Sequence, residues 1–112
     1  MKYLKIIAIP LFLLSTNAHA AGAYLASGAT VTDVVNIANN GQNFAVKTEG
    51  GSSNCNAQWI IFPEANAPNA NAHQRAYSTA LTALTTGMKV TIYNYADSTC
   101  VRASYIHLMK QR

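Results

Sequence analysis

Charged residues are scarce in this chain, and the shortage limits what it can bind. Asp and Glu contribute four residues and Lys and Arg eight, so only 11% of the 112 residues are charged. Two of these, Lys2 and Lys5, lie in a segment that we expect to be removed, which leaves six basic and four acidic residues and a net charge of +2. Binding to nucleic acid or to anionic lipid needs a dense patch of Lys and Arg. We therefore expect neither partner.

Residues that carry catalysis or bind metals are also few. Beyond the N-terminal segment only His73 and His107 remain, and no metal-ligand spacing, nucleophile elbow or phosphate-binding glycine loop is present. Glu64 lies in a loop rich in Pro and Asn, and Asp97 lies in a turn, where carboxylates usually bond to the backbone. A hydrolase would need a pocket around His107 or paired carboxylates. We predict one small domain with no enzymatic activity, metal or cofactor.

The chain lacks an apolar run long enough for a membrane span, but its start is typical of a secretory signal peptide. Two lysines precede the apolar stretch 6–14, and residues 18–20 read Ala-His-Ala. A span needs about 20 continuous apolar residues. We predict cleavage after Ala20 and a mature domain over residues 21–112, located in the periplasm or secreted.

Cysteine is limited to Cys55 and Cys100, which are 45 positions apart. An even count in a short exported chain favours a disulfide, and there is no CxxC pattern to favour a redox-active pair. Closing a loop of this length contributes on the order of 4 kcal/mol in the chain-entropy description. We predict a structural disulfide.

Three strands are predicted in the first half of the mature chain. Residues 30–38 are β-branched and apolar and end in the turn sequence Asn-Asn-Gly at 39–41. Residues 43–49 alternate between apolar and polar, as a strand with one solvated face does. A Gly- and Ser-rich turn at 50–54 follows, and residues 57–62 are apolar on both faces, which predicts a strand in the middle of a sheet.

A loop and a helix come next. Two prolines and three asparagines indicate a loop over residues 63–71, and the spacing of Asn71 and Gln74 predicts a capping box for a helix over residues 72–86. Gly87 is the expected left-handed terminating residue. The predicted apolar stripe is Tyr77, Ala80, Leu81 and Leu84.

The opposite face of this helix carries almost no charge. It is formed by Ser78, Thr79, Thr82, Thr85 and Thr86. Exposed helices normally carry Lys and Glu, because threonine is only a middling helix former. Two interpretations remain open: a surface helix of weak propensity, or a helix whose small polar face packs against other copies in an oligomer.

Residues 89–95 alternate again, residues 96–99 form a turn, and residues 100–108 are predicted as the last strand. Three strands, a helix and two strands is the element order of the OB-fold, a small, partly open five-stranded barrel. We therefore predict a mainly β domain with one helix, and specifically an OB-fold-like barrel closed by its last strand.

Tyrosine stands out among the residue types, with six tyrosines against three phenylalanines. Tyr93, Tyr95 and Tyr105 lie on the last two predicted strands. Such rings offer flat apolar faces with a hydroxyl, a surface that suits sugars or bases. Aromatic residues are also favoured in strands simply because they pack well there.

The segment YSTALTALTTGMKVTIYNY, residues 77–95, resembles the helix-to-strand segment of the B subunits of subtilase-cytotoxin and typhoid-toxin type, which are pertussis-like pentameric toxins. The order of elements, the signal peptide and the cysteines agree in outline. The chain is also similar to small exported bacterial proteins of uncharacterised function. The toxin resemblance implies an OB-fold, a ring built through helix 72–86, and glycan binding.

In those B subunits a serine on the first strand, beside aromatic residues, bonds a sialic-acid carboxylate. Ser27 followed by Gly28 is the matching pair here, with Tyr24 nearby, whereas Ala26 stands where the family has an aromatic residue. The candidate ligand-binding residues are Tyr24, Ser27, Tyr93, Tyr95, Arg102 and Tyr105.

Taken together, the sequence favours an exported binding module that recognises a glycan or a cell-surface receptor. The alternative, from another class, is a periplasmic or secreted module that binds or inhibits a protein partner through a sheet edge, without sugar recognition.

Overall fold

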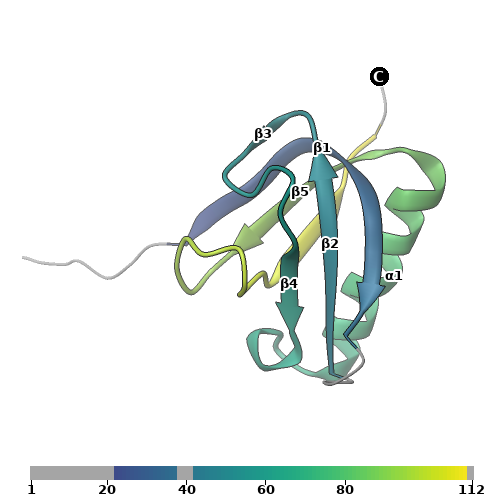
Figure 1. Cartoon of the computed structure of the whole chain (residues 1–112). Helices are drawn as coiled ribbons and strands as arrows, with labels where there is room; N and C mark the ends of the chain where they lie inside the picture. Colours follow the sequence, from purple (N-terminus) through teal and green to yellow (C-terminus); the bar gives the residue numbers. More distant parts are fainter. Residues whose placement is uncertain (1–21, 38–41, 111–112) are drawn as a thin grey trace, which may run out of the picture.

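A single helix lies beside an antiparallel sheet in the computed structural model, which describes residues 22–37 and 42–110 (Figure 1). The predicted signal peptide and the predicted turn at 39–41 lie outside the described residues. The elements are β1 (Ala23–Asn36), β2 (Asn43–Glu49), β3 (Ser52–Ser53), β4 (Ile60–Pro63), the 3-10 helix η2 (Glu64–Asn66), α1 (Ala70–Thr86), β5 (Lys89–Asn94) and β6 (Tyr105–Leu108). The prediction of a mainly β domain with one helix is confirmed.

The sheet has the strand order β4-β2-β1-β5-β6, with the short β3 paired to β1. All of these pairs are antiparallel. The prediction of a closed barrel is wrong, because β4 and β6 at the two ends do not pair. β4 is instead bonded to the loop that precedes β6, through the Ile61 amide to the Cys100 carbonyl and the Ala103 amide to the Ile61 carbonyl, both 2.9 Å long.

The first strand is much longer than predicted. It begins at Ala23 rather than at residue 30, and its two halves pair with different partners: Ala23 to Thr30 face β5, and Thr30 to Asn36 face β2. The first half contains small residues and Gly28, which have low strand propensity, so the local pattern misses it. Gly28 has a φ of 65° and lies at an irregularity in the pairing with β5, where the strand bends.

The apolar run 57–62 was predicted to be a central strand, and this prediction is wrong. The run leads into β4, which lies at the edge of the sheet. Ile60 and Phe62 are buried, while Trp59 is 41% exposed. The Trp59 ring is covered on one side by the Lys47 ammonium, 4.7 Å from the ring centroid. Apolar residues on both faces of a strand therefore do not prove a central position.

The helix begins two residues earlier than predicted. Its N-cap is Asn69, whose side-chain oxygen accepts a hydrogen bond from the Ala72 amide at 2.8 Å, so the predicted capping box of Asn71 and Gln74 is wrong. Both asparagines precede an apolar pattern, and the local sequence does not distinguish them. The predicted end is confirmed, because Gly87 has a φ of 77° and caps the helix in the left-handed conformation.

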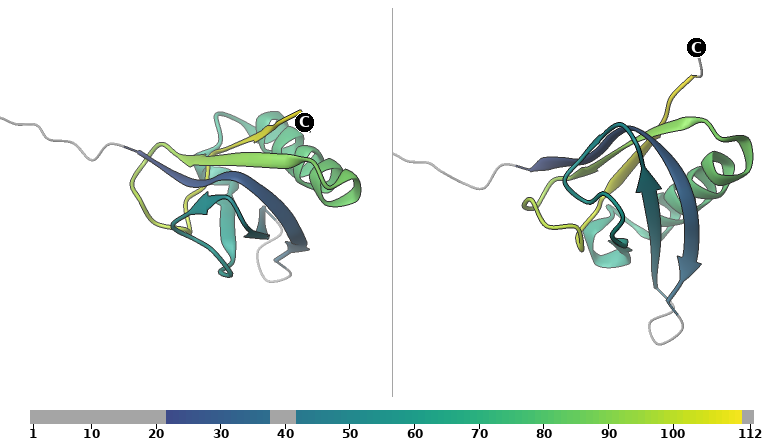
Figure 2. Two further views of the ribbon diagram at one scale, coloured as in Figure 1. Left: turned by 90° about the horizontal axis from the view of Figure 1, so that it is seen from above. Right: turned by 45° about the horizontal axis from the view of Figure 1, so that its top comes forward.

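The predicted apolar stripe of α1 is partly wrong. Ala80 is buried as predicted, but Leu81 and Leu84 are 39% and 40% exposed. The buried residues of the helix are His73, Ala80 and Ala83. Small alanines on this face allow the helix to lie close to β1 and β6, with which it makes its main contacts (Figure 2).

The threonine hydroxyls on the uncharged face of α1 are hydrogen-bonded within the helix. Thr79, Thr82, Thr85 and Thr86 each donate a hydrogen bond to the carbonyl four residues earlier, at 2.7 to 3.0 Å. These bonds give the hydroxyls partners inside the helix.

The last strand is shorter than predicted, since only Tyr105–Leu108 of the predicted range 100–108 pairs with β5. Residues 100–104 instead belong to a long loop that crosses to β4. The core lies between the sheet and α1 and includes Leu25, Val31, Phe44, Val46, Ile60, Phe62, Ala80, Ala83, Val90 and Ile92. No helix among the described residues is long and apolar enough to cross a membrane.

Candidate functional site

Three tyrosines form a row across the sheet at one end of β5. Tyr93 on β5 lies opposite Tyr24 on β1 and opposite Tyr105 on β6. Val90, Ile92 and Asn94 point into the core with 0% exposure. Because side chains alternate along a strand, Tyr93 lies on the other face. Tyr95, two residues further on, completes the cluster.

The four rings meet nearly at right angles. Ring centroids are 4.8 Å apart for Tyr24 and Tyr93, at an interplanar angle of 71°, and 4.9 Å apart for Tyr93 and Tyr95, at 69°. Tyr105 lies 6.4 Å from Tyr93 and 6.2 Å from Tyr95, at 79° and 83°. Edge-to-face contacts of this kind are a favourable arrangement for aromatic rings.

We call these four residues the tyrosine pocket, because they alone line a hollow of about 190 Å³. Tyr24 and Tyr95 are 62% and 65% exposed. Single exposed rings are common, but a contiguous group of exposed aromatic rings is typical of an interaction surface.

The backbone near the N-terminus of the domain holds Tyr93 in place. A Cβ atom on Gly22 would overlap the backbone carbonyl of Asn94 and would lie 2.9 Å from both a ring carbon and the hydroxyl oxygen of Tyr93. This separation is shorter than a normal contact, so only glycine allows the chain to pass this close to the ring.

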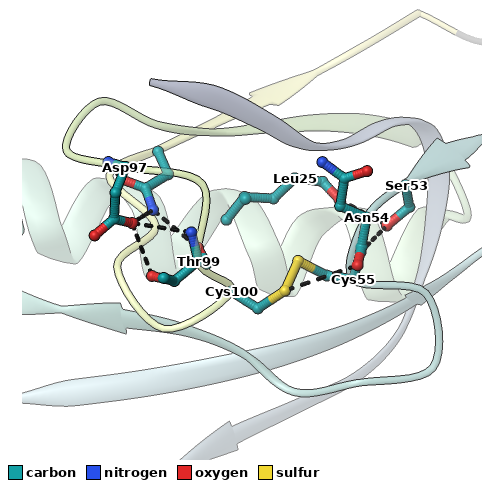
Figure 3. Close-up of a disulfide and its surroundings, with 8 residues drawn as sticks. Leu25, Ser53, Asn54, Cys55, Asp97, Thr99 and Cys100 are labelled. Carbon is teal, nitrogen blue, oxygen red and sulfur yellow. Dashed lines mark hydrogen bonds between the residues drawn. A yellow bond between two sulfur atoms is a disulfide. The ribbon is translucent and has the colours of Figure 1, made fainter. Parts of the chain in front are cut away.

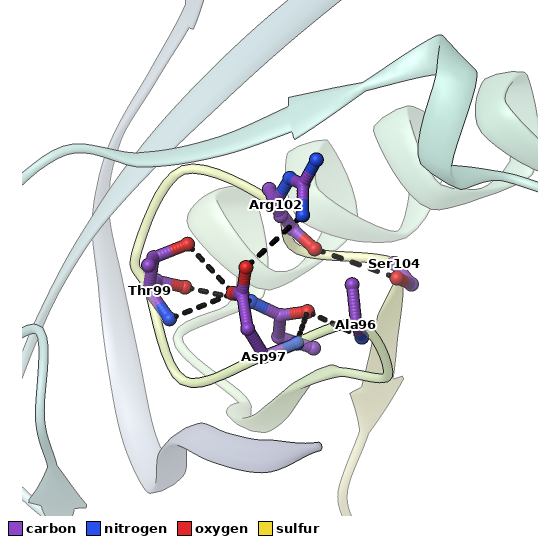
Figure 4. Close-up of polar contacts among 6 residues, drawn as sticks. Ala96, Asp97, Thr99, Arg102 and Ser104 are labelled. Carbon is purple, nitrogen blue, oxygen red and sulfur yellow. Dashed lines mark hydrogen bonds and ion pairs between the residues drawn. The ribbon is translucent and has the colours of Figure 1, made fainter. Parts of the chain in front are cut away.

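A hydrogen-bonded turn follows β5 and begins directly after Tyr95 (Figure 4). The side chain of buried Asn94 donates to Asp97 Oδ1 at 2.7 Å and to the Thr99 carbonyl at 2.8 Å, and its oxygen accepts from the amides of Ala96 and Asp97. The Thr99 amide also donates to Asp97, and this bond is the largest cause of a lowered Asp97 pKa of about 2. The predicted turn at 96–99 is therefore a hydrogen-bonded unit.

The disulfide ties this loop to the other half of the sheet. Cys55 and Cys100 are bonded, with Cα atoms 5.9 Å apart, as predicted from the sequence (Figure 3). On the Cys55 side, Ser53 Oγ donates to the Leu25 carbonyl at 2.6 Å and accepts from the Cys55 amide at 2.9 Å. The loop that follows Tyr95 is thus fixed at its start by the turn and at its middle by the disulfide.

A wider groove adjoins the tyrosine pocket and shares Tyr95 and Tyr105 with it. It encloses about 690 Å³ between the first half of α1, the preceding loop and the start of β6. We call it the helix groove. Its lining residues are Asn66, Ala67, Pro68, Ala72, Arg75, Ala76, Thr79, Tyr95, Ser104, Tyr105 and Ile106.

Arg75 is the one charged residue among those that line the helix groove. No described acidic residue forms an ion pair with it; the ion pair in the described part of the chain joins Arg102 to Asp97. Sequence reasoning missed Arg75, Ser104 and Asn66, because only the crossing of α1 over the start of β6 places them together. Thr79 was identified as part of a polar helix face, but not as part of a groove.

Two predicted ligand residues lie apart from the tyrosine pocket. Ser27 is exposed on β1 and pairs with Thr91, two cross-strand pairs along the ladder from Tyr24 and Tyr93, and lines neither hollow. Arg102 was predicted on a strand but lies in the loop before β6. There its guanidinium donates to Asp97 at 3.1 Å (Figure 4).

The two histidines are placed differently. His73 is buried, with Nε2 donating to the Phe62 carbonyl at 2.8 Å and its ring against Phe44. His107 is exposed on β6 near Tyr105. Within residues 22–37 and 42–110, no three His, Cys, Asp or Glu side chains come together in a way that could hold a metal ion.

Residues 4–110 match a family described as a family of unknown function, DUF5992. No curated protein and no solved structure matches the chain.

Proposed function

The chain belongs to the DUF5992 family of unknown function, and we propose that it is an exported, non-enzymatic binding module that recognises a glycan in the helix groove. The carrying observation is that two exposed tyrosine rings and several polar side chains line one hollow. A sugar ring presents an apolar C–H face and a rim of hydroxyls. The helix groove offers both kinds of partner.

The stacking surface of the proposed site is supplied by Tyr95 and Tyr105. Their rings stand 6.2 Å apart at 83°, so a sugar can lie on one ring while the other closes the side of the groove. Arg75, Ser104 and Asn66 can bond sugar hydroxyls, and Thr79 Oγ1 keeps acceptor capacity after donating to the Arg75 carbonyl. The volume lies in the usual range for small-ligand sites.

A prearranged loop supports the proposal. The Asn94 and Asp97 hydrogen bonds hold the start of the segment between Tyr95 and Ser104, the disulfide holds its middle, and the Ser104 amide bonds to the Tyr93 carbonyl at its end. Ordering a loop on binding costs affinity, and a loop already fixed avoids that cost.

Export is supported by the disulfide, because such bonds persist in oxidising compartments. The signal peptide over residues 1–20 remains a prediction. The toxin-like features are also proposals: a sialic-acid contact at Ser27, and a ring built through helix 72–86. Exposed Leu81 and Leu84 on α1 offer an apolar surface for such a ring.

A glycan array followed by calorimetry tests the main proposal. We expect Arg75→Gln and Tyr95→Ala to weaken binding of an array hit by about tenfold or more, because each removes a groove contact. Lys110→Gln is the matched charge control, since Lys110 does not line the groove. Ser27→Ala tests the toxin-like site separately. Absence of any bound sugar at millimolar concentration would count against the proposal.

The mass in solution tests the ring. An assembly of about five copies that Leu81→Arg dissociates supports contacts through α1, because a buried charge without a partner is costly. A monomer at all concentrations removes the ring from the proposal and leaves glycan binding in the groove intact.

A protein partner is the second candidate, and the open sheet favours it. β6 pairs only with β5 among the described strands, so its other edge is available for an added strand. A pull-down from native cell envelopes discriminates between the two. A stoichiometric protein that stays bound in excess sugar favours the edge, and release by sugar favours the groove.

A further inference from the structure

We infer that the tyrosine pocket binds a quaternary ammonium group, such as the trimethylammonium end of choline. The inference goes beyond the proposed function, because Tyr24 and Tyr93 do not line the helix groove and a sugar is not needed to fill the pocket. It rests on the angles between the rings and on the absence of acidic residues from the lining.

The ring arrangement suits a cation. The faces of aromatic rings carry a negative quadrupole, and cations sit over them. Because the rings that line the pocket meet at 69° to 83°, a group held among them faces more than one ring at once. A flat ligand stacks well on only one of several perpendicular walls.

The pocket lining favours a quaternary over a primary ammonium. A primary ammonium carries three N–H donors that need acceptors, whereas a trimethylammonium group has none. Four tyrosines line the hollow, so its side-chain acceptors are neutral hydroxyls, and no carboxylate is present to pair with a charged N–H donor. Methyl groups that spread the positive charge against ring faces need no such acceptor. Desolvation also costs less for the larger, weakly hydrated ion.

No cationic side chain of the described residues is placed over these rings. The cation–π contact in the described part of the chain is that of Lys47 over Trp59, on the β2–β4 side of the sheet. The nearby Arg102 is held by Asp97 at 3.1 Å. The hollow of about 190 Å³ is small enough for a headgroup, in contrast to the 690 Å³ of the helix groove.

The test compares choline with its neutral carbon analogue, 3,3-dimethylbutan-1-ol, on the full mature, disulfide-bonded protein. Titrations followed by NMR of the tyrosine ring protons should show choline binding about tenfold more tightly, because shape and apolar area are matched and only the charge differs. The inference is overturned if both compounds bind with equal affinity. It is also overturned if choline does not bind at 100 times the highest concentration of the analogue that is titrated.

Variants locate the binding. Tyr24→Leu should weaken choline binding by about fivefold or more, while Tyr24→Phe keeps the ring face and should retain it. Both replace an exposed side chain, so an unchanged melting curve is expected and shows that the fold persists. If Tyr24→Leu binds choline as the wild type does, the pocket is not the site.

The two proposals fail independently. Arg75→Gln should reduce binding of a glycan in the helix groove and leave choline binding unchanged, and Tyr24→Leu should do the reverse. If neither the wild type nor any variant binds choline, the ammonium proposal is wrong and the glycan proposal is unaffected. Titration with free choline, phosphocholine and phosphatidylcholine vesicles then distinguishes sources: vesicle binding that choline competes indicates a lipid headgroup, and binding of the soluble compounds alone indicates a small solute.

Discussion

Two groups of aromatic side chains in this domain are packed in opposite ways. In the core, Phe44 and Phe62 stack nearly in parallel, with centroids 4.6 Å apart and an angle of 7°. On the other face of the sheet, Tyr24, Tyr93 and Tyr95 meet edge to face. The phenylalanines have no polar atom and are almost fully buried, whereas Tyr24 and Tyr95 are 62% and 65% exposed. The comparison shows that the side of the sheet, not aromatic content, separates the buried rings from the exposed ones.

The largest expected loss of stability comes from removing an aromatic ring from the core. Phe44→Ala should lower the free energy of unfolding by about 3–5 kcal/mol, because it leaves a cavity against Phe62 and His73. Tyr24→Ala should cost less than about 1 kcal/mol, as exposed substitutions usually do. Urea denaturation with unchanged slopes measures both. If both variants lose similar free energies of unfolding, the two groups of rings contribute equally to stability and the comparison is wrong.

Removing the disulfide should have the next largest effect. Cys55→Ser combined with Cys100→Ser should destabilise the domain by about 2–4 kcal/mol, because the unfolded chain gains freedom and the loop after Tyr95 loses an anchor. We expect a lower melting temperature together with weaker ligand binding at temperatures where the variant is folded. If the melting temperature falls and affinity is unchanged, the loop is held by the Asn94 and Asp97 bonds alone.

Acid should loosen the turn around Asp97, which adjoins the tyrosine pocket, before it unfolds the core. The folded pKa of Asp97 is about 2 and its ordinary value is 3.8. A lowered pKa means that the ionised form stabilises the fold, so this contribution is complete above pH 4 and is lost as the pH falls toward 2. Near-ultraviolet circular dichroism of tyrosine should follow the change. Asp97→Asn should flatten this pH dependence; an unchanged profile would assign it to another group.

The most local change is Gly22→Ala. The added Cβ would overlap the backbone carbonyl of Asn94 and press on the Tyr93 ring, so the start of β1 has to shift. We expect altered NMR shifts of that ring and weaker choline binding, with the Phe44 and Phe62 core unchanged. Gly50→Ala is the control, because Gly50 has a φ of 73° but open space around it. It should cost about 1 kcal/mol through backbone strain and leave the tyrosine resonances in place.

The sequence predicted much of the architecture from local patterns. The second strand, the end of the helix at Gly87 and the disulfide were correct, because each depends on alternation, one residue type or the compartment. The errors share a cause. Residues 23–29 of β1, the edge position of β4 and the loop over residues 100–104 depend on partners distant in the sequence, which no local pattern contains.

For the site, the sequence by itself provided Tyr93 and Tyr95, two residues apart on one predicted strand, and Tyr105 on the next. Only the tertiary structure decided that Tyr24 joins them, that Arg102 turns away to Asp97, and that Arg75 of α1 reaches the groove. The physical reason is that strand alternation is set by covalent geometry, whereas a pocket exists only where register and helix packing bring separate elements together.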